Sequence, residues 1–360
     1  MTTVGARTFV RSDIIVIGGG VVAVVLAALT RFVGGGAVLA FACAALAVTL
    51  LASLVGRSVE QLGDRFGPGA TGVLQSALGN LPELFIALFA LRAGLVDVVK
   101  AALIGSILAN LLLVLGLCFV VGGLKHGTQK LDSERARSII VLMVLSVAAL
   151  VLPSLAHLLH TPAAQHENTL SLIVSAILLL LFVLTLPASL RRGSNQQAEE
   201  SMQVEPPRWP VALAVGLLAL AAVLAAFVSD WFVHALEPAM ATLHISDAFA
   251  GLVIVAIAGN AIENVVGVQL AAKNRSEYAF SVVINSPMQI ALVLAPVLVI
   301  LSQVLGFAAL TLVFSPMLIV SVAIAVILSA FITFDGESNW IEGAALIAVY
   351  VIIAASFWWG

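Results

Sequence analysis

The strongest constraint on this chain is a series of long apolar segments that follow one another along its whole length. Each is close to or above the roughly 20 residues that an α-helix needs to cross the ~30 Å hydrocarbon layer of a bilayer. Because 62% of the residues are hydrophobic and only 10% are charged, we predict an all-α polytopic membrane protein. Eleven segments indicate eleven transmembrane helices: 14–30, 36–62, 70–91, 96–124, 138–159, 170–190, 210–232, 249–272, 278–301, 307–331 and 339–359.

The charged residues exclude one class of function and orient the chain. The net charge is −3, from 16 Lys and Arg against 19 Asp and Glu, and the sequence has no basic stripe, so nucleic-acid binding is not supported. If the N-terminus is cytoplasmic, 13 of the 16 basic residues fall on the cytoplasmic side, and Arg31, Arg92 and Lys100 fall outside. The positive-inside rule therefore predicts a cytoplasmic N-terminus and an external C-terminus.

One polar motif occurs twice, each time in the middle of an apolar segment. The first copy reads ALGNLPEL and continues to IGSILAN, and the second reads IAGNAIEN and continues to INSPMQI. The copies lie 180 positions apart, and this offset relates Glu83 to Glu263 and Ser106 to Ser286. The first copy begins in the third predicted span and the second copy begins in the eighth. This odd offset of five means that they cross the membrane in opposite directions, as in transporters with inverted-topology repeats.

The duplicated motif predicts a cation site near the bilayer midplane. A carboxylate at that depth costs several kcal/mol unless it is paired, hydrated, protonated or bound to a cation, and no Lys or Arg lies at a comparable depth. Carboxylate, amide and hydroxyl oxygens are the ligands that hard cations such as Ca²⁺ prefer, whereas transition metals prefer nitrogen or sulfur. The predicted ligands are Glu83, Glu263, Asn80, Asn260, Ser106, Ser286, Asn110 and Gln289, and the two glutamates are also the predicted proton carriers.

Backbone carbonyl oxygens are expected near the same motifs, where the helices are interrupted. Gly79 loosens its helix, and Pro82 and Pro287 each remove a backbone N–H. Broken helices at midplane depth are typical of ion sites in transporters.

These motifs resemble the Ca²⁺/H⁺ exchanger family of the calcium/cation antiporter superfamily. The similarity covers most of the chain and includes GRSVEQLG, GSILANLLLVLG, LEPAMATLHISDAFAGLVIVAIAGN and SPMQIAL. It implies one peripheral helix followed by two inverted five-helix repeats, and extrusion of cytosolic Ca²⁺ against inward H⁺. By position, it implies two ion-binding glutamates, Glu83 and Glu263, with the flanking polar ligands Asn80, Asn260, Ser106 and Ser286.

A polar linker that contains Glu199 and Glu200 divides the chain. We expect an N-terminal segment and peripheral helix at 1–33, a first five-helix repeat at 34–190, a cytoplasmic linker at 191–208 and a second five-helix repeat at 209–360.

The function predicted from these observations is secondary active transport and not an enzymatic reaction. Ca²⁺ and H⁺ are expected to compete for the two glutamates during alternating access, in an integral membrane protein that needs no cofactor. The expected partners are the two ions and the lipid bilayer, and a homo-oligomer is compatible with the sequence. The short N-terminal lead favours a prokaryotic plasma (inner) membrane over a vacuole.

Several alternative functions stay open at this point. Pro82 and Asn264 differ from the residues that are common in the family, which leaves a Na⁺/Ca²⁺ exchanger as the nearest alternative, beside another divalent cation/proton antiporter. A cation channel would use the two glutamates as a filter, and an intramembrane hydrolase would use them as an acid and base pair. The two glutamates have the same local context, which disfavours the hydrolase because an acid and a base need different environments.

Overall fold

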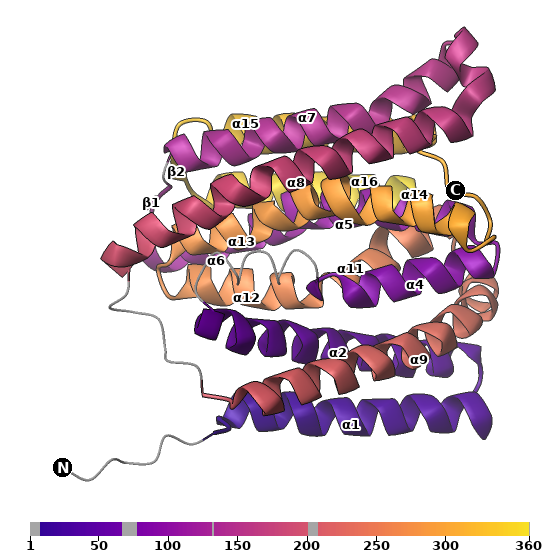
Figure 1. Ribbon diagram of the computed structural model, residues 1–360, viewed down its shortest axis with the longest axis horizontal. Coiled ribbons are helices and arrows are strands. Elements are labelled where there is room, and N and C mark those ends of the chain that lie inside the picture. Colours follow the sequence, from indigo (N-terminus) through magenta and orange to yellow (C-terminus); the bar gives the residue numbers. More distant parts are fainter. Residues whose placement is uncertain (1–7, 67–77, 132, 201–207, 360) are drawn as a thin grey trace. The chain divides into compact units, whose positions relative to one another are not determined.

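Helices make up most of the residues that the structure describes, which confirms the predicted all-α class. The computed structural model describes the backbone of residues 8–66, 78–131, 133–200 and 208–359 (Figure 1). It describes the side chains of these residues except 63–66, 133–139, 186–200 and 261–263. The only strands within these ranges are β1 (Gln129–Lys130) and β2 (Glu337–Ser338), which pair antiparallel.

Eight of the described helical segments are long and apolar enough to cross a membrane, which is the mark of an integral membrane protein. A bent pair of helices adds a ninth crossing if it counts as one span, and Trp340–Ser356 is a shorter apolar helix. The predicted span at 70–91 is represented by α4 (Leu81–Arg92) alone, because residues 67–77 lie outside the described ranges. The count of eleven therefore stays a prediction. The eight segments are Arg11–Phe32, Ala37–Leu62, Val96–His126, Ile140–Leu158, Pro162–Thr185, Val211–Leu243, Ser276–Val304 and Pro316–Thr333.

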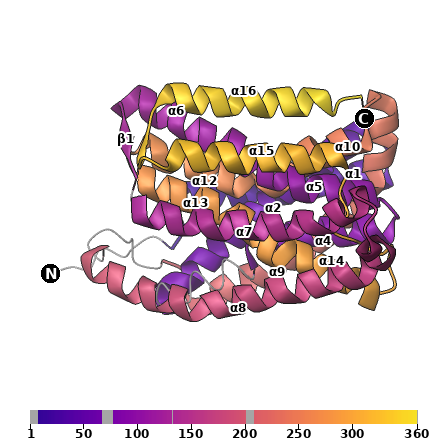
Figure 2. The same cartoon turned by 90° about the horizontal axis from the view of Figure 1, so that it is seen from above.

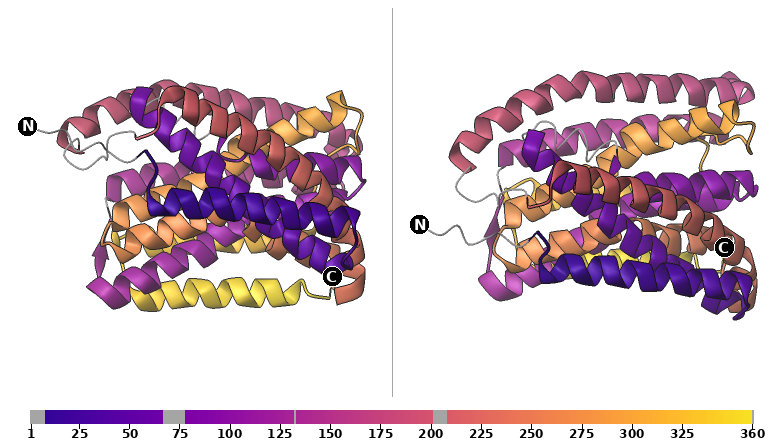
Figure 3. Two further views of the ribbon diagram at one scale, coloured as in Figure 1. Left: turned by 90° about the horizontal axis from the view of Figure 1, so that it is seen from below. Right: turned by 60° about the horizontal axis from the view of Figure 1, so that its bottom comes forward.

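The chain divides into two compact units, of which the first contains Met1–Phe89 and Phe182–Leu243. In this unit α2 (Ala37–Phe66) packs against both α1 (Arg11–Phe32) and α9 (Val211–Leu243), and Figure 3 shows the same three helices from two other sides. Their apolar faces meet around Trp209, which is fully buried.

A buried carboxylate joins α1 to α2 in this first unit. Asp13 is only 2% exposed, and its Oδ1 atom accepts a hydrogen bond from Arg57 Nη1 at 2.7 Å. Its Oδ2 atom accepts from the Val10 backbone N–H at 3.1 Å and lies 4.0 Å from Arg208 Nη2. Removing one partner of a buried pair is costly because the other charge stays buried.

We expect Arg57→Met to lower the free energy of unfolding by about 3 kcal/mol, because it leaves the Asp13 carboxylate without its shortest ion pair. Asp13→Asn together with Arg57→Met should cost less than the sum of the two single changes. Thermal unfolding in detergent of the wild type and the three variants would measure this. Additive effects of the two changes would contradict the assigned pairing.

The second unit contains Ala90–Leu181 and His244–Gly360. Helices α6 (Leu115–His126) and α16 (Trp340–Ser356) lie side by side in it (Figure 2), because Gly116 and Gly343 let their backbones approach closely. A Cβ atom at Gly116 would lie 2.7 Å from the Gly343 carbonyl oxygen.

The helices that begin in this unit are α5 (Val96–Leu108), η1 (Ala109–Val114), α6 (Leu115–His126), α7 (Ser133–Leu158), η2 (Pro162–His166), α8 (Glu167–Glu200), α10 (Asp247–Phe249), η3 (Ala250–Val255), α11 (Ala256–Gly259), α12 (Ala261–Ala272), α13 (Ser276–Gln289), η4 (Ile290–Leu294), α14 (Ala295–Val304), α15 (Pro316–Thr333) and α16 (Trp340–Ser356).

Three helix boundaries lie far from the ends of the corresponding apolar segments. Helix α8 continues through part of the predicted linker to Glu200, and α9 continues to Leu243. Helix α15 begins at Pro316, although its apolar segment begins at residue 307. Serine hydroxyls from three helices accept hydrogen bonds from the backbone of this non-helical stretch: Ser302 from Leu310, Ser171 from Leu312 and Ser154 from Phe314. These side chains replace the helical bonds that the apolar pattern leads one to expect.

Candidate cation site

The two copies of the duplicated motif have the same local backbone. In the first copy a turn at Gly79 and Asn80 precedes α4, and in the second copy a turn at Asn260 separates α11 from α12. The first helical bonds match as well: the Leu84 N–H donates to the Asn80 carbonyl at 2.9 Å, and the Asn264 N–H donates to the Asn260 carbonyl at 3.1 Å. The helix interruption predicted at Gly79 and Pro82 is therefore confirmed in the first copy. In the second half the interruption was predicted at Pro287, which instead lies inside α13, and the break lies at Asn260.

The correspondence continues into the next helix of each copy. Gly94 and Asn274, which are 180 positions apart, both have positive φ angles, of 84° and 61°. Asparagine is one of the few residues other than glycine that adopts this conformation readily. Helices α5 and α13 begin two residues later, at Val96 and Ser276. The internal repeat thus holds in the backbone as well as in the sequence.

Both second helices then widen into a π-helix. Helix α5 passes into η1, and α13 passes into η4 directly after Gln289. Short π-helical segments are rare in proteins, but those that occur often lie at functional sites. They change which backbone groups are paired and alter the direction of the side chains on them. Asn110 lies within η1, so its side chain is presented by this irregular turn.

Four of the predicted ligands lie together in the second unit. Asn260 Nδ2 donates to Ser106 Oγ at 2.8 Å, and Asn260 Oδ1 accepts from Asn110 Nδ2 at 2.7 Å. Ser286 Oγ lies 3.2 Å from Asn260 Oδ1 and 3.2 Å from Asn110 Nδ2. All four side chains are buried, with exposed fractions of 4% or less. The cluster brings Ser106 and Asn110 from the first repeat together with Asn260 and Ser286 from the second.

Two glycines allow the elements that carry this cluster to approach closely. A Cβ atom on Gly105 would lie 2.7 Å from the carbonyl carbon of Leu252 and closer still to its carbonyl oxygen. A Cβ atom on Gly251 would likewise overlap the carbonyl oxygen of Val98. Helix α5 and η3 are therefore in backbone contact, which places Ser106 beside the helix break at Asn260.

Asn80 and Glu83 belong to the first unit. Glu83 lies in the first turn of α4 and is 8% exposed, and Asn80 is half-buried. The first turn of a helix favours a carboxylate, because the unpaired backbone N–H groups there carry a partial positive charge. This local field offsets part of the cost of burying the ionised Glu83 side chain.

The remaining two predicted ligands are Gln289 and Glu263. Gln289 is the last residue of α13 and is partly buried. The backbone of Glu263 lies in the first turn of α12, at the position that Glu83 occupies in α4, while its side chain lies outside the described residues.

The sequence did not identify the backbone oxygens of the cluster. The Ser106 carbonyl accepts from Asn110 Nδ2 at 2.9 Å, and the Ala256 carbonyl accepts from Asn260 Nδ2 at 2.8 Å. The predicted sources of carbonyl oxygens were the prolines, whereas these two carbonyls lie four residues before an asparagine. An asparagine near a helix break, with a carbonyl one turn earlier, is the signal that finds them.

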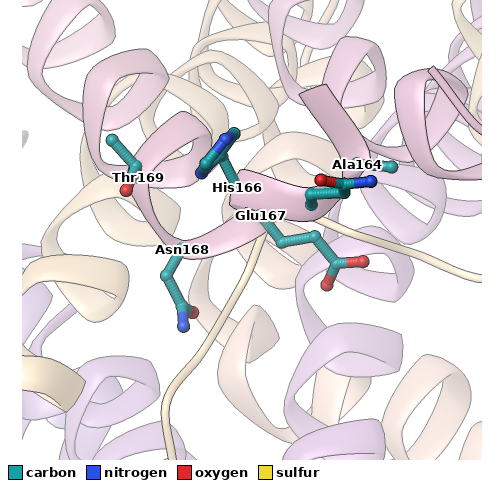
Figure 4. Close-up of a pocket in the computed structure, with 6 residues that line it drawn as sticks. Ala164, His166, Glu167, Asn168 and Thr169 are labelled. Carbon is teal, nitrogen blue, oxygen red and sulfur yellow. The ribbon is translucent and has the colours of Figure 1, made fainter. Parts of the chain in front are cut away.

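A surface pocket in the second unit has a different chemistry. It is lined by Ala164, Gln165, His166, Glu167, Asn168 and Thr169, which belong to η2 and the first turn of α8 (Figure 4). Glu167 Oε1 also pairs with His157 Nδ1. None of the predicted ligands lines this pocket, and all six histidines of the chain are exposed. A histidine relay through the cluster therefore has no support.

Comparison with known proteins gives consistent matches over most of the chain. The family described as sodium/calcium exchanger protein matches residues 36–190 and 213–359. The chain is 35% identical over 333 residues to a Ca²⁺/H⁺ antiporter of Aphanothece halophytica, covering 88% of this chain and 89% of that protein. It is 38% identical over 322 residues to the Ca²⁺/H⁺ antiporter ChaA of Bacillus subtilis (strain 168), covering 88% of this chain and 91% of the relative.

The fold also matches a solved structure. The structure of native YfkE superposes with a TM-score of 0.82 at 33% identity, over 95% of this chain and 99% of that chain. Both copies of the duplicated motif fall inside the residues matched by the family.

Proposed function

Because the chain belongs to the sodium/calcium exchanger family, and within it to the group of Ca²⁺/H⁺ antiporters, we propose that it exchanges Ca²⁺ for H⁺ across a membrane. The observation that carries this function is the cluster of Ser106, Asn110, Asn260 and Ser286. It gathers neutral oxygen ligands from both repeats at the helix break before α12, whose first turn contains Glu263. Neutral oxygens together with carboxylates form the ligand set that Ca²⁺ prefers.

The proposed mechanism is mutual exclusion at Glu83 and Glu263. Two ionised carboxylates match the charge of one Ca²⁺ ion, and protons cancel the same charge when the ion has left. An empty site with both carboxylates ionised is too costly to pass through the low-dielectric barrier, so the return step requires protons. The remaining proposed oxygen ligands are Asn80, Asn260, Ser106, Ser286, Asn110 and Gln289.

The membrane arrangement is part of the proposal. Eleven transmembrane helices, with one peripheral helix at 1–33 and inverted repeats at 34–190 and 209–360, would expose the site alternately to the two sides. The distribution of Lys and Arg supports a cytoplasmic N-terminus, an external C-terminus and a cytoplasmic linker at 191–208. We place the protein in a prokaryotic plasma membrane, as a single chain or a homo-oligomer, with no cofactor beyond the transported ions.

The test is Ca²⁺ flux into proteoliposomes that contain the full chain. We expect an imposed pH gradient to drive Ca²⁺ accumulation and proton movement in the opposite direction, whereas a Na⁺ gradient at clamped pH should drive none. Flux driven only by Na⁺ would instead establish a Na⁺/Ca²⁺ exchanger, the second candidate, which the description of the matched family favours. Conduction without coupling to either gradient would indicate a channel.

A further inference from the structure

All donors and acceptors of the Asn260 side-chain amide take part in hydrogen bonds. An asparagine amide has two N–H donors and an oxygen with two lone pairs. Asn260 Nδ2 donates to Ser106 Oγ and to the Ala256 carbonyl, each at 2.8 Å. Asn260 Oδ1 accepts from Asn110 Nδ2 at 2.7 Å and from Ser286 Oγ at 3.2 Å. In this arrangement Asn260 Oδ1 has no lone pair left for a cation.

Asn110 is bonded in the opposite way. Its Nδ2 atom has three oxygens around it: Asn260 Oδ1 at 2.7 Å, the Ser106 carbonyl oxygen at 2.9 Å and Ser286 Oγ at 3.2 Å. Its Oδ1 atom is buried and has no hydrogen-bond partner among the described residues. The reversed amide would turn Oδ1 against three oxygens, so the hydrogen-bond network determines the orientation of the amide.

Three oxygens that converge on one electropositive atom form a partial cation site. Ca²⁺ binds such oxygens at 2.3–2.6 Å, and Asn110 Nδ2 stands among them at hydrogen-bond distances. Nδ2 carries a partial positive charge and satisfies the same lone pairs that a cation would use. The position of Nδ2 and the binding of a cation by these three oxygens are therefore mutually exclusive.

We propose that Asn110 is a positioning residue whose amide nitrogen stands in for the cation, so that Ca²⁺ must displace Nδ2 from the three oxygens in order to bind them. The inference rests on the proposed function and changes the role of one member of its ligand set. When Ca²⁺ leaves, Nδ2 returns and satisfies the oxygens, which stabilises the proton-loaded site. Asn110 thereby weakens Ca²⁺ binding and speeds Ca²⁺ release.

The side chain of Asn110 is suited to this movement. The terminal torsion of asparagine is broad and roughly two-fold, so the amide turns at little cost once its bonds are replaced. A buried acceptor without a partner is expensive, so the unpartnered Oδ1 atom adds no bond that holds the amide in its present orientation.

The test compares Ca²⁺ binding and transport in Asn110→Ala and the wild type. Removing the competing amide should lower the Kd for Ca²⁺ about five- to ten-fold at constant pH, as expected for one to two net hydrogen bonds that no longer need to be broken. Maximal exchange should fall, because Ca²⁺ release slows and the proton-loaded site loses its internal donor. KM and the maximal rate should therefore decrease together in proteoliposomes.

Controls separate this effect from a general disturbance. Ser329→Ala removes a buried hydroxyl that donates to the Leu111 carbonyl in the same π-helix at 3.2 Å, and it should leave Kd unchanged. Asn110→Ser keeps one hydroxyl and should give an intermediate Kd, and this variant decides the question if Asn110→Ala does not fold. A Kd that rises or stays the same overturns the stand-in role, and a rise makes Asn110 a simple ligand. Such a result leaves the proposed function intact if wild-type flux still follows the pH gradient.

Discussion

Replacing Glu83 with glutamine is expected to reduce Ca²⁺ accumulation driven by a pH gradient to the level of empty liposomes. Glutamine keeps the size and one oxygen of the side chain, but it removes the charge that Ca²⁺ and H⁺ are proposed to share. With one carboxylate left, the divalent charge is only half compensated in a low-dielectric site, and the proton-dependent step loses a carrier. Glu263→Gln should have the same effect, because its position in α12 repeats that of Glu83 in α4.

A matched control uses an acidic residue outside the proposed site. Glu237 on α9 is exposed, so Glu237→Gln makes the same chemical change without altering the buried charge. Glu237→Gln should transport Ca²⁺ at the wild-type rate. Glu83→Gln should remain monodisperse in detergent, but it should neither bind Ca²⁺ there nor transport it in proteoliposomes. Ca²⁺/H⁺ exchange at the wild-type rate by Glu83→Gln would contradict the shared-carboxylate mechanism, even if the chain is an exchanger.

Replacing Gly105 with alanine is expected to destabilise the second unit by about 3 kcal/mol, the upper range for forcing an extra methyl group into a packed core. The added Cβ would meet backbone atoms of Leu252, which cannot turn away as a side chain can. Helix α5 and η3 would have to separate, although alanine is the better helix former. Thermal unfolding in detergent should therefore show a clear drop in the midpoint.

Gly216→Ala is the control for this change. Gly216 lies on α9, and a Cβ atom built there would have no heavy atom within 4 Å. Alanine at this position should be neutral or stabilising by up to about 1 kcal/mol, because it loses less backbone freedom on folding. Equal stability of Gly105→Ala and Gly216→Ala would show that the close approach of α5 and η3 is not required for folding.

Much of the architecture could be read from local patterns. Long apolar segments predict membrane helices because no other local structure pairs every backbone group without water. The first motif predicted an interrupted helix at Gly79 and Pro82, and a turn at Gly79 and Asn80 is present. The interruption predicted at Pro287 was wrong, because Pro287 lies inside α13 and the second break lies at Asn260. The same reading was wrong at the start of α15, where serines from other helices satisfy the backbone before Pro316. Those bonds join residues far apart in the sequence, so no local pattern reports them.

For the site, the sequence determined which residue types recur 180 positions apart and therefore which oxygens are available. The tertiary structure decided which of them meet: Ser106 and Asn110 lie on the continuous α5–η1 helix, Asn260 lies in the turn before α12, and Ser286 lies on α13. It also decided that Asn260 presents its oxygen to Asn110 while Asn110 presents its nitrogen to the cluster. The two amides are chemically identical, and their opposite orientations depend on the donors and acceptors that packing places around each one. Composition and spacing carry no information about those neighbours, which the packing of α5 and η1 against the turn at Asn260 and against α13 supplies.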